Sequence, residues 1–162
     1  MALEINVRRE LGFARQFLAH NLAATGAFEE ARALYEGARS IWDSLDYESR
    51  SLEAVAGLAR VALACDELSA ARAYAEHMST HLKESDLQGA DDPSRVYVTC
   101  YQVFAALHDA RAHPVLQAGG RRLQERAAKI SDASYVARFW KMCRPMLNCV
   151  ACCSRDSTPN TL

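Results

Sequence analysis

Residues 26–45, GAFEEARALYEGARSIWDSL, carry a pattern that returns forty residues later as DELSAARAYAEHMSTHL, residues 66–82. The recurring pairs are Leu18 and Leu58, Ala19 and Ala59, Ala24 and Ala64, Ala31 and Ala71, Arg32 and Arg72, Ala33 and Ala73, and Glu36 and Glu76. A fixed period of about twenty to fifty residues is typical of stacked repeats. The sequence therefore predicts a repeat architecture, whose general class of function is binding.

The composition suits one helical domain with no strong electrostatic field. Half of the 162 residues are hydrophobic, and only seven are Gly and four are Pro, as closely packed helices require. Nineteen Lys and Arg residues against twenty Asp and Glu residues leave a formal net charge of -1. Such a chain has no overall field to attract nucleic acid or anionic lipid. We therefore expect neither of these partners.

The first residues, MALEINVRREL, carry charges where a secretory signal would need an apolar run. No segment approaches the run of about eighteen apolar residues that indicates a membrane span. We therefore expect a cytoplasmic protein. In that reducing compartment the six Cys residues are expected to be free thiols, and Cys65 and Cys100 lie within apolar helical patterns.

Apolar spacing predicts a series of helices joined by short turns. In the first of them Val7, Leu11, Ala14, Leu18 and Leu22 share one face. Gly26 then allows the chain to leave that helix and turn back, so that the next helix is antiparallel to it. The expected helices span about residues 7–24, 28–45, 48–64, 67–84, 93–107, 114–130 and 131–142.

Capping residues predict where several of these helices begin. Asn6, Asp66 and Asp92 are expected N-caps of the first, fourth and fifth helices, and Ser131 or Asp132 is expected to cap the last one. Pro93 follows Asp92 at the first helical position, where a missing N–H costs nothing.

Two Gly residues and one Pro predict weaker regions near the carboxyl end. Gly119 and Gly120 cost about 1 kcal/mol each relative to Ala, so we expect the sixth helix to be weak or kinked. Pro145 is expected to end the last helix. The sequence thus predicts a folded domain over residues 1–145 and a disordered tail over residues 146–162, which shows no periodicity.

Small residues recur where the two helices of each expected hairpin would meet. Together with larger residues at fixed positions, they form two matching sets. The sets are Leu18, Ala19, Leu22, Gly26, Phe28, Ala31, Tyr35 and Ala38, and then Leu58, Ala59, Ala62, Leu68, Ala71 and Ala75. These positions resemble the tetratricopeptide repeat, in which small side chains let paired helices approach closely. With its longer period, the chain is similar to the tetratricopeptide region at the C-terminal end of large bacterial signalling ATPases, LuxR-type regulators and cyclase-linked proteins.

The resemblance covers about residues 5–145. It implies an all-α, tetratricopeptide-like α-solenoid of about three antiparallel helical hairpins plus a C-terminal capping helix. The third unit departs from the pattern, because its small positions become Tyr101 and His113. A phosphate-binding loop, a helix-turn-helix module and a cyclase domain are absent from the sequence. The resemblance therefore implies the sensing or docking part of such a protein.

Three patterns suggest other chemistry, and each has a simpler interpretation. His77 and His81 are spaced to share a metal ion on one helix, and Cys149, Cys152 and Cys153 form a C-x2-C-C run. Neither set supplies the four ligands of a zinc site, so we expect no metal and no cofactor. The stretch RRLQERAAK reads as the charged face of an amphipathic helix. With no nucleophile elbow and no Gly-rich loop, we expect a non-enzyme without catalytic residues.

The first helix of each hairpin is expected to line a concave wall. Matching to the tetratricopeptide pattern directs six polar side chains towards that wall, namely Gln16, His20, Glu53, Arg60, Arg95 and Gln102. Such a groove could hold a segment of another protein or of a neighbouring domain. The sequence therefore predicts a monomeric protein–protein interaction scaffold, a regulatory or docking module of a bacterial signalling or transcription-regulatory protein.

Two alternatives stay open at this point. The first is an effector-sensing domain that holds a small molecule inside the curve of its helices. The alanine-rich first helices place no aromatic cluster there, which favours the scaffold. The second is a truncated fragment of a larger protein, with no independent role.

Overall fold

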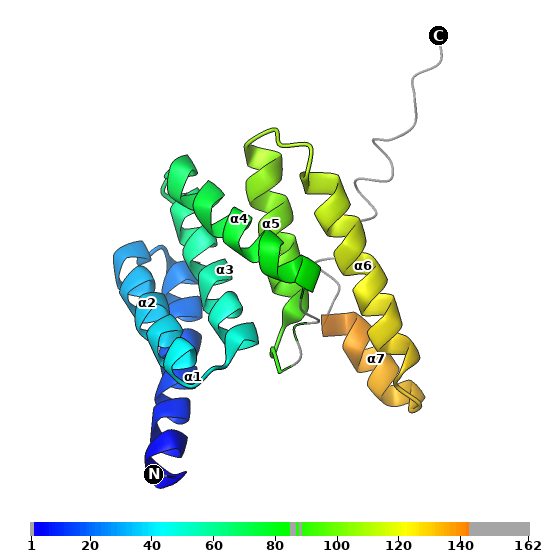
Figure 1. The fold of residues 1–162 in the computed structure, drawn as a ribbon, viewed down its shortest axis with the longest axis horizontal. Coiled ribbons are helices and arrows are strands. Elements are labelled where there is room, and N and C mark those ends of the chain that lie inside the picture. The colour runs from blue at the N-terminus through cyan, green and yellow to red at the C-terminus, as the bar shows by residue number, and fades with distance from the viewer. Residues whose placement is uncertain (1, 85–86, 88, 143–162) are drawn as a thin grey trace.

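The computed structural model describes residues 2–84, 87 and 89–142, and every regular element among them is an α-helix (Figure 1). In chain order the helices are α1 (Ala2–Thr25), α2 (Phe28–Ser44), α3 (Glu48–Ala64), α4 (Leu68–Glu84), α5 (Pro93–Ala106), α6 (Ala112–Ala128) and α7 (Ala133–Met142). The predicted all-α class is thus confirmed. The predicted tail, the stop at Pro145 and the Cys run lie outside the described residues.

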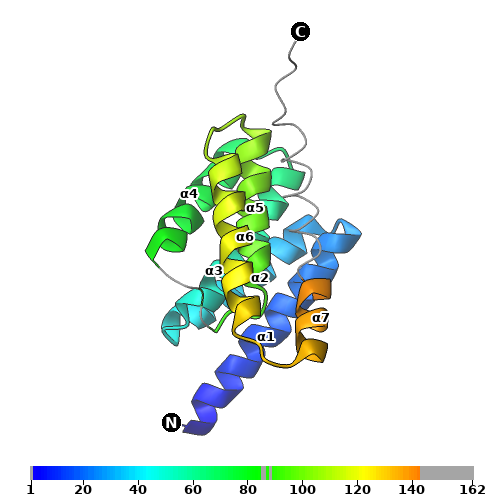
Figure 2. The same ribbon diagram turned by 90° about the vertical axis from the view of Figure 1, so that its right-hand side faces the viewer.

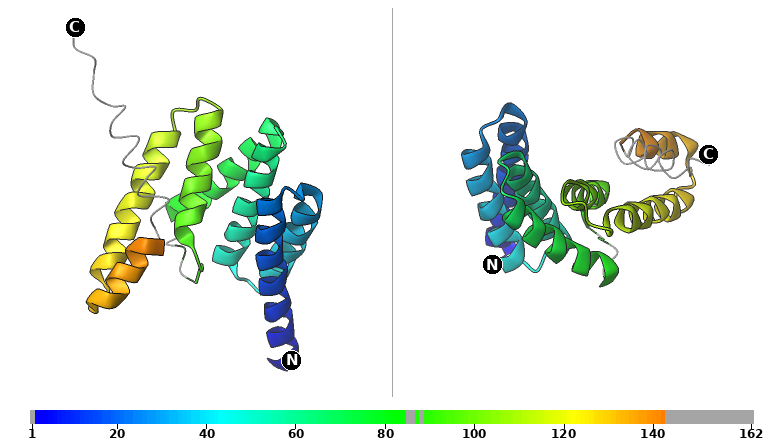
Figure 3. Two further views of the ribbon diagram at one scale, coloured as in Figure 1. Left: turned by 180° about the vertical axis from the view of Figure 1, so that it is seen from behind. Right: turned by 90° about the horizontal axis from the view of Figure 1, so that it is seen from above.

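Helices that are neighbours in the sequence are neighbours in space. Each of α1 to α6 packs on the next, and α7 contacts α6. The odd-numbered helices also touch one another, α1 with α3 and α3 with α5. Figures 1 and 3 show the pairs α1–α2, α3–α4 and α5–α6 following one another from one end of the molecule to the other, and Figure 2 views this row end-on from the side of α6 and α7. One side of this row is therefore built from α1, α3 and α5.

The reversals within the three pairs share one backbone form. Gly26, Asp66 and His108 all have positive φ, at 86°, 61° and 52°. The residue after each donates its N–H to a carbonyl five residues earlier, at 2.9, 2.8 and 2.8 Å. This is the Schellman arrangement that ends a helix with a left-handed residue. Asp66 therefore reverses the chain, and since α4 begins at Leu68, it does not take the N-cap position that we predicted.

Small buried residues line the contact within each pair. They are Ala19, Ala59 and Cys100 on the first helices and Ala31, Ala71 and Ala112 on the second helices, and none is more than 4% exposed. The predicted third-unit positions were wrong by one residue, because Tyr101 is only partly buried and His113 is exposed. The period grows from forty to forty-one here, since Cys100 follows Ala59 by forty-one residues and Ala112 follows Ala71 by forty-one.

The exposed face of α1 differs from the prediction. Val7, Leu11 and Leu18 are 60%, 45% and 51% exposed, whereas Leu58, the counterpart of Leu18 in α3, is 1% exposed. The helix pair α1–α2 covers this face of α3, but α1 is the first helix that the structure describes. The helix also begins at Ala2 and not after an Asn6 cap.

The carboxyl-terminal helices follow the predicted caps. The Asp92 carboxylate accepts the backbone N–H of Arg95 at 3.2 Å, and Asp132 accepts that of Ser134 at 2.7 Å. The sixth helix, α6, runs as one helix through Gly119 and Gly120. Its contact with α5 buries Gly119, so tertiary packing offsets the low helix propensity that led us to expect a weak element.

Candidate functional site

The six side chains predicted to face a groove all come from α1, α3 and α5, but two are buried, three line a pocket and one is exposed outside it. Gln16 and Glu53 are only 5% and 4% exposed. The Trp42 indole N–H donates to Gln16 Oε1 at 2.9 Å, and Gln16 Nε2 donates to Glu53 Oε2 at 3.4 Å. Glu53 Oε1 accepts the backbone N–H of Asp92 at 2.5 Å. These two side chains join the helices, so we remove them from the predicted contact surface.

The buried carboxyl of Glu53 makes stability depend on pH. Burial raises the pKa of Glu53 in the folded protein. The protonated Glu53 carboxyl therefore contributes fully to the free energy of unfolding below its unfolded pKa of about 4.3. This contribution is lost as pH rises through the higher pKa of the folded protein. We expect the urea midpoint of Glu53→Gln to rise relative to that of the wild type as pH increases from about 4 through the folded pKa of Glu53. A constant difference between the two proteins over this range would contradict this account.

A pocket of about 370 Å³ opens between α1, α2, α3 and α5. His20, Arg60 and Arg95 line it, as does Tyr35 from α2. The structure thus brings three predicted residues together, while Gln102 is exposed on α5 outside the pocket. The remaining lining is mostly apolar and consists of Ala23, Ala24, Phe28, Val61 and Ala64.

Short polar contacts join His20, Tyr35 and Arg60 and connect Arg60 to α5, while Arg95 contacts Asp92. His20 Nδ1 lies 2.5 Å from the Tyr35 hydroxyl. Arg60 donates from Nη1 to Thr99 Oγ1 at 3.1 Å and from Nη2 to the Tyr35 hydroxyl at 3.5 Å. Arg95 Nε lies 3.3 Å from the Asp92 carboxylate. Sequence reasoning assigned Tyr35 to packing alone; the one available signal was a Tyr, instead of a Phe, at a position that is fully buried.

The ionisation states leave one unbalanced positive charge at this pocket. Burial, with Arg95 and then Arg60 adding to it, lowers the pKa of His20 to about 4, so the imidazole is neutral at pH 7. Burial raises the pKa of Tyr35, which keeps the phenol neutral. Arg95 is balanced by Asp92. Burial lowers the pKa of Arg60, but a guanidinium stays charged at neutral pH.

A second recess, of about 400 Å³, contains His77 and His81 together with Glu48. His81 Nδ1 lies 2.9 Å from the His77 carbonyl oxygen, and its Nε2 lies 3.3 Å from Glu48 Oε1. Among the residues that the structure describes, no three His, Cys, Asp or Glu side chains are placed to hold a metal ion.

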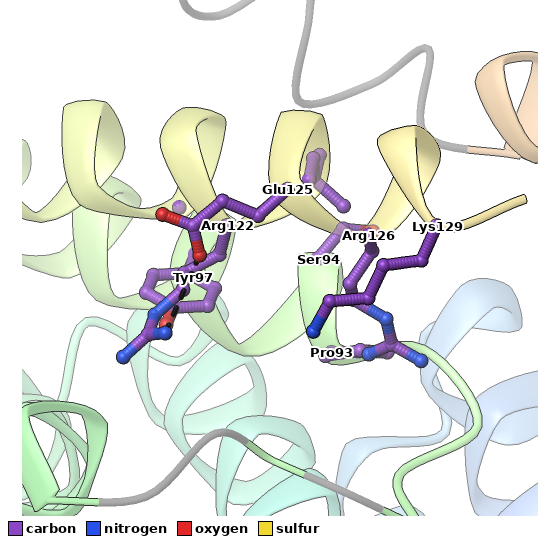
Figure 4. A pocket seen from close by; sticks show the side chains of 9 residues that line it. Pro93, Ser94, Tyr97, Arg122, Glu125, Arg126 and Lys129 are labelled. Carbon is purple, nitrogen blue, oxygen red and sulfur yellow. Dashed lines mark hydrogen bonds and ion pairs between the residues drawn. The ribbon is translucent and has the colours of Figure 1, made fainter.

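The basic stretch of α6 lines a third, much smaller pocket between α5 and α6 (Figure 4). Figure 4 shows Arg126 and Lys129 extending towards Pro93 at the start of α5. Arg122 lies 3.4 Å from Glu125. With a volume of about 20 Å³ the pocket has room for about one water molecule and for no larger ligand.

No helix in the described part of the chain has both the length and the apolar character needed to cross a membrane. Comparison of the chain with models of known protein families, with curated proteins and with solved structures finds no match. The pocket that His20, Tyr35, Arg60 and Arg95 form is therefore the candidate functional site.

Proposed function

We propose that this chain is a protein-interaction module whose surface of α1, α3 and α5 holds a segment of a partner protein or of a neighbouring domain. The observation that carries the proposal is the open pocket of about 370 Å³, whose polar groups come from all three helix pairs. No single pair could form it. A surface assembled from successive helix pairs is how stacked helical repeats bind extended partners.

We further propose that the three pairs form a tetratricopeptide-like α-solenoid, with α7 covering its last pair. Support comes from the sequence period, from the shared form of the turns at Gly26, Asp66 and His108, and from the packing of successive helices. The resemblance to tetratricopeptide regions of bacterial regulators favours a regulatory or docking role in signalling or transcription. We expect the module to be monomeric and cytoplasmic.

A small-molecule effector is the second candidate. Its support is the pocket volume, which falls in the range of about 300–1,000 Å³ common to small-ligand sites, and the presence of Phe28 and Tyr35 in the lining. Such sites enclose most of their ligand. This pocket opens at the surface and has three alanines, Ala23, Ala24 and Ala64, on its walls, which favours an extended partner.

Selection of random peptides displayed on phage against the purified chain tests the proposal. Selected peptides should bind the wild type, and Ala64→Trp should weaken that binding by at least about tenfold, because the indole would occupy the pocket. Ala64 is exposed at the end of α3, so the change should leave the fold intact. The matched control is Ala33→Trp, at an exposed position of α2 outside the pocket.

Two results would contradict the proposal. One is a selection that enriches no binding peptide. The other is equal affinity of the selected peptides for Ala64→Trp, Ala33→Trp and the wild type. This would show that the peptides bind outside the surface of α1, α3 and α5.

A further inference from the structure

Arg60 forms no ion pair with an acidic side chain in the described part of the chain. Its acceptors in the described part of the chain are two hydroxyls, those of Thr99 at 3.1 Å and Tyr35 at 3.5 Å. By contrast, Arg32 pairs with Glu67 at 2.7 Å, and Arg50 pairs with Asp91 at 2.6 Å. A guanidinium has five N–H donors, and desolvating its charge without a counter-charge is unfavourable. The Arg60 side chain is therefore poised to gain an anionic partner.

The surroundings of Arg60 neither neutralise it nor repel an incoming anion. No Asp or Glu lines the pocket. Arg95 adds no net charge, because Asp92 lies 3.3 Å from its Nε. His20 is neutral at pH 7 for the reason given above. The pocket thus holds a net charge of about +1, located on one guanidinium.

We propose that this pocket binds one carboxylate group, supplied by an acidic side chain or by the C-terminus of a peptide segment, with Arg60 as its main contact. A carboxylate carries one negative charge and fits the fork of a guanidinium with two parallel hydrogen bonds. It would neutralise the single positive charge of the pocket, whereas a phosphate dianion would leave one negative charge uncompensated. The small side chains of Ala23 and Ala64 leave space for the peptide that carries the group. Only the source of the carboxylate rests on the proposed function; the anion site itself does not.

Titration with sodium acetate, at constant ionic strength set by sodium chloride, tests the site by itself. Two-dimensional NMR spectra should show saturable shifts of the Thr99 amide and the Ala64 methyl group. Arg60→Gln should abolish these shifts. Arg72→Gln should retain them, because Arg72 lies on α4 outside the pocket and already has Asp109 at 3.5 Å. The proposal would be overturned if acetate caused equal shifts in Arg60→Gln and the wild type. It would also be overturned if acetate caused no shifts in the wild type. Tighter binding of inorganic phosphate than of acetate would overturn the carboxylate assignment.

A double-mutant cycle tests the peptide source. Peptides selected on the wild type should contain an acidic residue or a required C-terminal carboxylate. Converting that group to its amide should weaken binding to the wild type by at least about tenfold but leave binding to Arg60→Gln nearly unchanged. The melting temperature of Arg60→Gln should not fall, because the substitution removes a desolvated charge.

The outcomes separate the two proposals. Peptides that bind at the pocket without any carboxylate, with equal affinity for Arg60→Gln, would overturn the carboxylate site and leave the interaction module standing. Saturable acetate shifts together with a failed peptide selection would support the site and contradict the module.

Discussion

Replacing Leu58 with Ala is expected to lower the free energy of unfolding by about 2–5 kcal/mol, while Leu18→Ala changes it by only about 0.5 kcal/mol. The two residues occupy the same position in successive repeats. Leu58 is 1% exposed and packs with Ala19, Ala31 and Tyr35, so its truncation leaves a cavity. Leu18 is 51% exposed, and truncation there removes little buried area.

Urea denaturation of both variants measures the difference. Each midpoint is compared with that of the wild type, and circular dichroism confirms that both variants are helical. Similar losses in the two variants would show that a further element covers the outer face of α1, and that the arrangement described here is incomplete.

The second large effect is expected at a glycine. A Cβ added to Gly57 would lie 2.3 Å from Tyr35 Cε1, and the buried Tyr35 ring is held by the contacts of its hydroxyl with His20 and Arg60. Ala gains about 1 kcal/mol over Gly in a helix interior, but the overlap outweighs it. We expect Gly57→Ala to destabilise the protein by about 1–3 kcal/mol. Because the Tyr35 hydroxyl contacts His20 and Arg60, the variant should also lose peptide binding.

Gly37→Ala is the matched control for this prediction. Gly37 also lies inside a helix, but its added Cβ would meet the end of the Arg15 side chain at 2.6 Å, which is flexible and can move away. This variant should be as stable as the wild type or more stable by up to about 1 kcal/mol. A thermal or urea melt that ranks Gly57→Ala at or above Gly37→Ala would show that the Tyr35 ring does not pack on α3 as described.

The repeat could be predicted from the sequence because it depends on local chemistry. Small residues such as Ala31 and Ala71 mark where paired helices touch, and Gly26 marks a reversal whatever the later packing is. The face of α1 that carries Leu11 and Leu18 could not be assigned in this way. Apolar periodicity shows which face is suited to burial, but not whether a neighbouring helix is present to cover it.

The candidate site was predicted only in part, for a similar reason. Repeat matching indicated which side chains point from the first helices, and His20, Arg60 and Arg95 do meet at the pocket. It could not show that Gln16 and Glu53 satisfy each other in the interior, since hydrogen bonding between helices depends on distances that no sequence pattern contains.

NMR of alanine methyl groups during titration with a selected peptide tests whether a partner segment lies on the surface of α1, α3 and α5. The methyl groups of Ala23, Ala24 and Ala64 line the pocket, whereas Ala33 and Ala73 are exposed on α2 and α4 outside it. We predict saturable shifts for the first three and none for the last two. Shifts at Ala33 and Ala73 without shifts at the pocket methyl groups would contradict the account.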